Sequence, residues 1–156
     1  MDKGGTVVTL SCPVSSRTER SISQFGNMLV CTTGQSVLRY SDYGCFCGLG
    51  GSGDPVDALD KCCQRHDNCY NALLDGTLDY CESGINIYDV VYQYSVNNCV
   101  SQGGGGPFSR SVITCHSELN SKCEQRLCEC DRRAAMCMAA VPYNNQYASY
   151  DRNGQC

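Results

Sequence analysis

DKCCQRHDNCY, residues 60–70, lies in a stretch from 56 to about 75 that contains no glycine or proline. This pattern predicts one continuous helix, and Asp54-Pro55 suits its beginning because an acidic residue and a proline are both favoured around the first turn. Cys62 and Cys69 are seven residues apart, a spacing that returns to nearly the same face of a helix. The segment is therefore predicted to turn two cysteines toward one neighbour.

A second glycine-free stretch runs from residue 109 to about 141, before Pro142, and predicts another helix. Two of its cysteines are again seven residues apart. If the two helices pack antiparallel, both pairs of cysteines fit a single register, although spacing alone leaves other pairings open. The disulfides predicted by that register are Cys62–Cys137 and Cys69–Cys130.

The histidine of the first helix has candidate catalytic partners. The same register brings Asp131 within a turn of the position opposite His66, and Tyr70 follows His66 by one helical turn. An imidazole oriented by a carboxylate can act as a general base toward water near neutral pH. A lone helical histidine is more often structural, so the catalytic interpretation also depends on the adjacent carboxylate of Asp67.

A glycine turn bounded by cysteines, YGCFCGLGGSG at residues 43–53, precedes the helix. Glycine tolerates positive φ, so backbone carbonyls could converge here on a hard cation such as Ca2+, with Asp67 completing the ligand shell. Such a turn can also be only a tight connection, and the joint pattern is what favours a metal site. Two alternatives fail, because the GxGxxG spacing lacks a βαβ context and Ser52 is not in a GxSxG elbow. Water is the predicted nucleophile.

Composition sets the broad class of the protein. The chain has 156 residues, 15 of them cysteine, and a formal net charge of −4. The length predicts one domain, and the cysteine density predicts a disulfide scaffold that is secreted into an oxidising environment. A zinc or cluster protein is disfavoured because ligand-spaced His and Cys pairs are missing. The acidic balance argues against nucleic acid and against strong attraction to anionic membranes.

The remaining segments predict smaller elements. A short helical pattern begins at Ser21 and puts Ile22, Phe25 and Leu29 on one apolar face, which is either an ordinary core surface or the lining of an apolar ligand path. Between the two long helices, residues 76–107 predict a hairpin or irregular wing with an open loop. This region holds the β-prone residues 87–94 and the glycine run 103–106.

These motifs closely resemble those of secreted phospholipase A2 of the pancreatic and elapid type. The resemblance covers residues 21–156 and is strongest in YGCFCGLGGSG (43–53), DKCCQRHDNCY (60–70) and CECDRRAAMC (128–137), with VPYNNQY (141–147) pancreatic-like. It implies a mainly α fold with an N-terminal helix, a calcium-binding loop, two long antiparallel disulfide-linked helices and a small antiparallel β wing.

The resemblance also implies an activity and its residues. The activity is calcium-dependent hydrolysis of the sn-2 ester of glycerophospholipids at a membrane or aggregate surface. His66 would activate water with Asp131 and Tyr70 in support, and the Gly48 N–H would help to stabilise the oxyanion. A further tyrosine of this network is either Tyr92 or Tyr94. The Ca2+ ligands would be Phe46, Gly48, Gly50 and Asp67, and the acyl channel and interface would include Ile22, Phe25, Leu29 and Leu49.

Fourteen cysteines are assigned by the resemblance, which leaves Cys12 over. Residues 1–20 then resemble an activation peptide cleaved after Arg20 by a trypsin-like protease, and Cys12 could instead link two chains. Besides the two pairs above, the implied disulfides are Cys31–Cys99, Cys45–Cys156, Cys47–Cys63, Cys81–Cys123 and Cys115–Cys128.

Three departures from the family pattern stand out. Phe46 replaces the usual tyrosine, Ser23 stands where some relatives place an interfacial tryptophan, and the segment between Cys99 and Cys115 is longer than usual. Only the carbonyl of residue 46 is needed for a metal, so the first change costs little. The competing classes are a phospholipase-like binding protein without catalysis and a toxin whose partner directs its action, and both the metal aspartate and the base favour an enzyme.

Overall fold

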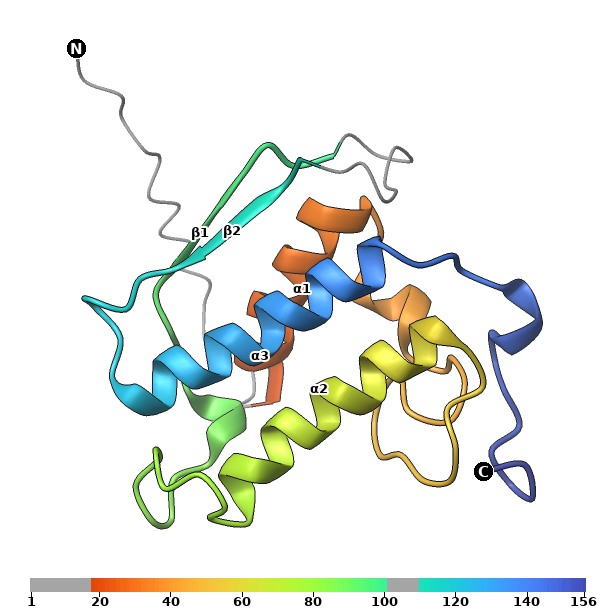
Figure 1. The fold of residues 1–156 in the computed structure, drawn as a ribbon, viewed down its shortest axis with the longest axis horizontal. Coiled ribbons are helices and arrows are strands. Elements are labelled where there is room, and N and C mark those ends of the chain that lie inside the picture. Colours follow the sequence, from red (N-terminus) through yellow and green to blue (C-terminus); the bar gives the residue numbers. More distant parts are fainter. Residues whose placement is uncertain (1–17, 101–109) are drawn as a thin grey trace.

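The computed structural model describes residues 18–100 and 110–156, and the predicted glycine loop 103–106 lies outside them. Within these ranges the chain forms three α-helices, three short 3-10 helices and one two-stranded sheet (Figure 1). The helices α2 and α3 lie side by side, and α1 crosses α3 from the other side. The bounds are α1 Thr18–Thr33, η1 Val37–Tyr40, α2 Ala58–Leu74, η2 Ile87–Asp89, β1 Tyr94–Asn97, β2 Val112–Cys115, α3 Lys122–Ala139 and η3 Asn145–Tyr147.

The two long helices begin later in the chain than the sequence pattern predicted. Helix α2 begins at Ala58 rather than near Pro55, because the Asp57 side chain accepts a hydrogen bond from Asp60 N and caps the helix. The predicted helix from residue 109 was wrong over its first part, where β2 lies instead. Helix α3 begins only after Ser121, which forms a reciprocal capping box with Glu124.

The β wing is present, but its first strand is displaced from the predicted position. Residues 87–94 were expected to be extended, whereas Ile87–Asp89 forms η2, because the Asn86 side chain accepts a hydrogen bond from Tyr88 N and caps that short helix. Strand β1 begins at Tyr94 and pairs antiparallel with β2, with Tyr94 opposite Cys115. The predicted hairpin is thus confirmed with a later start.

The disulfides fix the helix pair and its surroundings. Cys62–Cys137 and Cys69–Cys130 join α2 to α3 in the single antiparallel register predicted from spacing, and they close loops with sequence separations of 75 and 61. Chain-entropy arguments give each such crosslink about 4 kcal/mol of stabilisation. The other five are those implied by the family resemblance: Cys31–Cys99, Cys45–Cys156, Cys47–Cys63, Cys81–Cys123 and Cys115–Cys128. Cys12 lies outside the described residues.

The core lies where α1 and α2 pack against α3. Met28 and Leu29 of α1 are fully buried with Leu59 of α2 and Leu127 of α3. Thr32 adds a buried hydrogen bond from its hydroxyl to the Ala135 carbonyl, at 2.9 Å.

Helix α1 begins at Thr18, so the proposed boundary after Arg20 falls within this helix. No helix among the described residues has the length and apolar character needed to cross a bilayer.

Candidate active site

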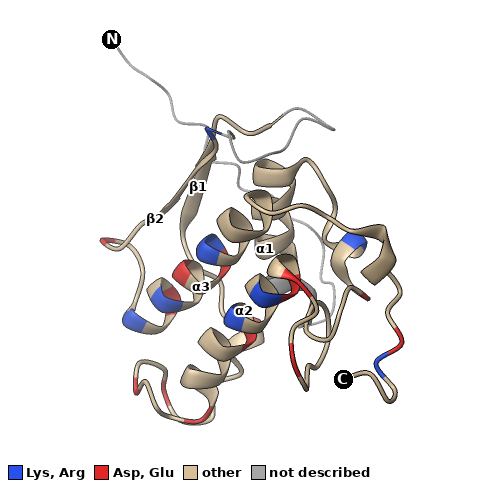
Figure 2. Cartoon of the chain, turned by 45° about the vertical axis from the view of Figure 1, so that its right-hand side comes forward, with Lys and Arg blue, Asp and Glu red and all other residues tan. Residues whose placement is uncertain are grey.

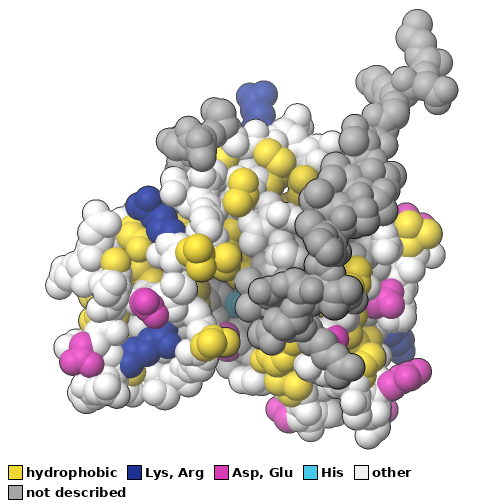
Figure 3. Space-filling model, turned by 180° about the vertical axis from the view of Figure 1, so that it is seen from behind, with side chains coloured by type: hydrophobic (Ala, Val, Ile, Leu, Met, Phe, Trp, Pro, Cys, Tyr) yellow, Lys and Arg dark blue, Asp and Glu magenta, His cyan; other side chains and the backbone are white. Residues whose placement is uncertain are grey.

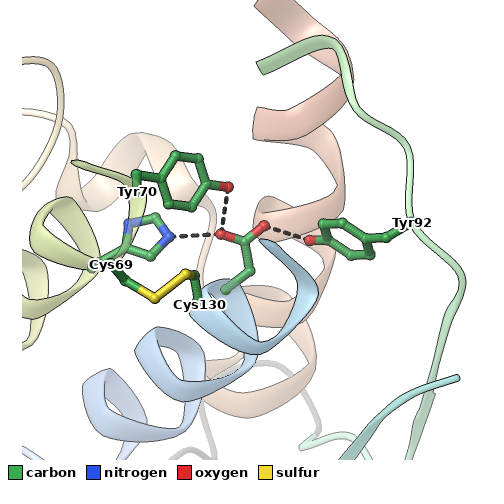
Figure 4. A network of polar contacts seen from close by, with 6 residues as sticks. Cys69, Tyr70, Tyr92 and Cys130 are labelled. Carbon is green, nitrogen blue, oxygen red and sulfur yellow. Dashed lines mark hydrogen bonds and ion pairs between the residues drawn. A yellow bond between two sulfur atoms is a disulfide. The ribbon is translucent and has the colours of Figure 1, made fainter. Parts of the chain in front are cut away.

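Asp131 of α3 is the centre of a hydrogen-bonded network that includes Tyr70 and Tyr92, labelled in Figure 4. Its carboxylate is fully buried, and Oδ1 lies 2.6 Å from His66 Nε2. The Tyr70 hydroxyl donates to the same oxygen at 2.7 Å, and the Tyr92 hydroxyl donates to Oδ2. The Cys69–Cys130 disulfide lies directly beside the network, so a covalent crosslink joins the two helices next to the pair of His66 and Asp131.

These contacts define the tautomer of the histidine. An ionised carboxylate only accepts hydrogen bonds, so His66 Nε2 must carry a proton and donate it to Asp131. In the neutral ring Nδ1 then has a free lone pair, and no group among the described residues hydrogen-bonds to it. His66 is therefore oriented to accept a proton at Nδ1 while Asp131 stabilises the resulting imidazolium.

The sequence left two tyrosines as alternatives for this network, and the structure distinguishes them. Tyr92 is buried, and burial followed by the nearby Asp131 charge raises its pKa well above 10, so the hydroxyl remains a donor. Tyr94 makes a different contact, accepting a hydrogen bond from Asn27 Nδ2 at 3.3 Å. Side chains alternate along an extended segment but residue order alone does not say which face meets Asp131.

Apolar residues surround the histidine unevenly. Phe25 stacks on His66 with ring centroids 4.5 Å apart, and the His66 side chain is 18% exposed. Leu29 is buried in the core, whereas Leu49 in the glycine turn is 88% exposed. The side chain of Ile22 is outside the described part of α1. Figure 3 shows apolar side chains gathered around a hollow in which a histidine is visible.

The glycine turn is held against α2 by a residue that the sequence analysis missed. Asp60 is fully buried, and its carboxylate accepts hydrogen bonds from Cys45 N at 2.9 Å, Phe46 N at 2.8 Å and Val56 N at 2.9 Å. An acidic residue in the first turn of a helix was the available signal, but its partners are known only from the tertiary structure. Asp60 fixes the start of the turn relative to the helix that carries His66.

Within this turn only glycine fits at residue 48. Gly48 has φ +98°, and a Cβ there would lie 1.8 Å from the Ser41 carbonyl oxygen. Gly50 also has positive φ, at +72°. At Gly48 the backbone therefore lies closer to Ser41 than a residue with a side chain would permit.

Asp67 faces this turn from α2. A Cβ on Gly51 would lie 3.0 Å from Asp67 Oδ2, so the carboxylate lies directly against the glycine backbone. Burial raises the pKa of Asp67 to about 6, with the nearby His66 and Arg152 charges acting in the opposite direction. No hydrogen-bond donor among the described residues pairs with this carboxylate. An unpaired, partly buried carboxylate beside a glycine turn is a site that a cation would stabilise.

The donor set fits calcium better than a transition metal. Within residues 18–100 and 110–156, no three His, Cys, Asp or Glu side chains gather in a way that could hold a metal. A site of backbone carbonyls and one carboxylate has only oxygen donors, which is the chemistry that Ca2+ prefers. With a base, a bare carboxylate and a glycine turn in close proximity, the arrangement suits attack of water on a carbonyl carbon.

The sequence of the chain is similar to those of known proteins over most of its length. A family model described as phospholipase A2 matches residues 22–148. A "Phospholipase A2" of Ovis aries is 44% identical over 132 residues, which are 83% of this chain and 95% of the relative. One from Bos taurus is 40% identical, covering 94% and 92%. "Acidic phospholipase A2 E" of Naja oxiana is 40% identical, covering 87% and 99%.

Proposed function

Because the chain belongs to the phospholipase A2 family, a family of esterases, we propose that it hydrolyses the sn-2 ester of glycerophospholipids in a calcium-dependent reaction. The products are a fatty acid and a lysophospholipid. The observation that carries this proposal is the orientation of His66, which donates from Nε2 to Asp131 and has Nδ1 unpaired among the described residues.

In this mechanism His66 Nδ1 accepts a proton from water as the water oxygen attacks the ester carbonyl carbon. The imidazolium that forms is stabilised by Asp131, whose charge is itself held by the Tyr70 and Tyr92 hydroxyls. As the tetrahedral intermediate collapses, the bond to the glycerol oxygen breaks and His66 returns the proton to that leaving oxygen. The side-chain network ends in the state in which it began.

The backbone of the glycine turn would help to stabilise the negative charge that develops on the carbonyl oxygen. The N–H of Gly48 would donate to this oxygen, a kind of interaction worth about 3 kcal/mol when it is lost. Ca2+, when bound, supplies electrophilic polarisation of the carbonyl. The residues that would hold it are Phe46, Gly48 and Gly50 through their carbonyls and Asp67 through its carboxylate.

The proposed substrate requires a lipid-facing surface. Phe25 stacks on His66, and the exposed Leu49 lies in the glycine turn. Ile22 and Leu29 are proposed to line the acyl path with them. Acidic and basic residues are interspersed along α2 and α3 (Figure 2), so these helices carry no run of basic residues that would bind a membrane by charge alone. Secretion is proposed from the disulfide framework.

Residues 1–20 are proposed to be an activation peptide that is removed after Arg20. Trypsin should then release a fragment ending at Arg20 and increase activity on lipid aggregates. Failure of either change would contradict the proenzyme hypothesis. Non-reducing electrophoresis before cleavage tests the separate hypothesis that Cys12 links the chain to a covalent partner.

The direct test of the activity is fatty-acid release from phospholipid vesicles with Ca2+ and with a chelator. Release is expected only with Ca2+, and only at the sn-2 position. Asp67→Lys should abolish Ca2+ binding and turnover while the seven disulfides remain formed. A phospholipase-like binding protein would associate with the vesicles and release no fatty acid, and calcium-dependent turnover in the Asp67 variant would contradict the metal site.

A further inference from the structure

The guanidinium of Arg152, near the C-terminus, is bound to the backbone of the glycine turn. Its Nε donates to the Gly44 carbonyl at 2.8 Å, and its Nη1 donates to the Leu49 carbonyl at 3.0 Å. Its Nη2 donates to the Cys47 carbonyl and, at 3.5 Å, to the Tyr43 carbonyl. One side chain thus contacts four carbonyl oxygens of the turn. Gly44, one of these four residues, is 108 positions away from Arg152 in sequence.

The carbonyls used by Arg152 are not those proposed for calcium. Arg152 contacts the oxygens of Cys47 and Leu49, whereas the proposed metal ligands are the oxygens of residues 46, 48 and 50. No oxygen belongs to both sets, so the two cations do not compete for a ligand. They would instead use alternate peptide groups of the same turn.

Arginine is suited to this role by its shape. Its planar guanidinium has five N–H donors in a fixed fork, so it can hold several carbonyls at once in one geometry. A lysine ammonium has the same charge but only three donors on a compact centre, and it cannot reproduce this spread of contacts. Carbonyl oxygens crowded into one turn repel each other, and a central cation offsets that repulsion.

Arg152 is itself held in place by the C-terminal segment. Cys156 N donates to the Arg152 carbonyl at 3.2 Å, and Cys156 is crosslinked to Cys45 inside the turn. Tyr150 N donates to the Asp42 carbonyl at 3.0 Å, which ties the same segment to the residue just before the turn. A Cβ on Gly53 would lie 2.3 Å from the Cys156 carbonyl oxygen, so the segment also closes over the end of the turn.

We propose that Arg152 is a positioning residue that holds the glycine turn in its calcium-binding conformation before the ion arrives. Because the turn is ordered in advance, binding does not have to supply the free energy of ordering it. This proposal rests on the proposed calcium site, and it assigns Arg152 no contact with the substrate. The charge of Arg152 near Asp67 is a separate effect, since it would oppose a bound cation rather than assist it.

The test compares Arg152→Gln and Arg152→Lys with Arg133→Gln, which removes the same charge from an exposed position on α3. Calcium affinity is measured by titration calorimetry, and hydrogen exchange of amides 43–51 is measured in calcium-free protein. Arg152→Gln should weaken Ca2+ binding by about tenfold or more and speed exchange in the turn. Arg152→Lys should recover only a small part of either loss, and Arg133→Gln should change neither.

Turnover at saturating Ca2+ separates positioning from a general structural defect. Arg152→Gln should raise the half-saturating Ca2+ concentration while kcat at saturation stays within about twofold of the parent. Equal or tighter Ca2+ binding, or unchanged exchange of the turn, would overturn the proposal. If the parent protein bound no Ca2+, the calcium-site proposal would fail, yet exchange in the calcium-free protein would still show whether Arg152 orders the turn.

Discussion

His66 Nε2 and Asp131 Oδ1 lie 2.6 Å apart although the two residues are 65 positions apart in sequence. The adjacent disulfide Cys69–Cys130 crosslinks α2 to α3 one residue before Asp131 and three after His66. The pairing of His66 with Asp131 thus belongs to the same register in which the disulfides join α2 to α3. Replacing His66 or Asp131 should therefore alter turnover while α2 and α3 stay packed together.

Asp131→Asn tests the tautomer argument. The amide can accept from a tyrosine hydroxyl, but it cannot stabilise an imidazolium, and it can present a donor to His66 Nε2 instead. We expect kcat to fall by about two to four orders of magnitude, as for loss of the orienting carboxylate in other triads. Ca2+ affinity measured by calorimetry should stay unchanged. Turnover within about tenfold of the parent would contradict the assigned role.

Tyr92→Phe removes one donor from the buried Asp131 carboxylate. Leaving a buried charged group with one partner fewer costs about 1 to 3 kcal/mol, so the free energy of unfolding should fall by that amount in denaturant titrations. Tyr94→Phe is the matched control, since its hydroxyl contacts Asn27 and not Asp131. Equal loss of stability in the two variants would contradict a specific stabilising role for the hydrogen bond from Tyr92 to Asp131.

The raised pKa of Asp67 predicts that the stability of the calcium-free protein depends on pH. Burial raises its pKa from 3.8 to about 6 in the folded state, so the folded state binds this proton more tightly than the unfolded state does. The ionised carboxylate therefore destabilises the fold at neutral pH, and this penalty is relieved as pH falls through about 6 toward 4. This change of stability with pH is opposite in sign to that caused by a salt-bridged aspartate.

The measurement compares the parent with Asp67→Asn, which is neutral at every pH. In calcium-free denaturant titrations Asp67→Asn should be the more stable protein near about pH 7, and the difference should narrow near about pH 5. Saturating Ca2+ at neutral pH should stabilise the parent and leave Asp67→Asn unaffected. A difference that stays constant over this pH range would show that Asp67 is not desolvated.

The sequence predicted the helix pair, its register and the partners of His66, because cysteine spacing on a helix carries three-dimensional information. The seven-residue intervals ending at Cys69 and Cys137 locate one face on each helix. Helix beginnings were less predictable, since Asp57 and Ser121 compete with nearby residues as caps and only local hydrogen bonds decide between them.

Long-range contacts of the glycine turn could not be read from the sequence. Asp60 looks like an ordinary acidic residue in the first turn of a helix, and its three backbone partners become visible only when the turn folds onto α2. Arg152 has no local pattern at all, because its carbonyl partners come from a distant segment. Side chains that bind backbone leave no complementary residue type in the chain to identify them.

Gly48→Ala tests whether the conformation of the turn is required for the metal. At φ +98° an added methyl group would lie 1.8 Å from the Ser41 carbonyl oxygen, so the turn must move or Ser41 must be displaced. We expect Ca2+ affinity to fall by more than about a hundredfold, with a matching loss of turnover, because the carbonyl and the N–H of residue 48 both shift. The seven disulfides should still form.

Gly50→Ala and Gly76→Ala separate this clash from the cost of positive φ. Both positions have φ above +70°, and an added Cβ at either meets nothing within 4 Å. Each variant should therefore lose only about 1 to 2 kcal/mol of stability through backbone strain. Gly76 lies beyond α2 and away from the turn, so its variant should keep full Ca2+ affinity, whereas Gly50→Ala should weaken binding less than Gly48→Ala. If all three variants bound Ca2+ equally, the turn would not be the metal site.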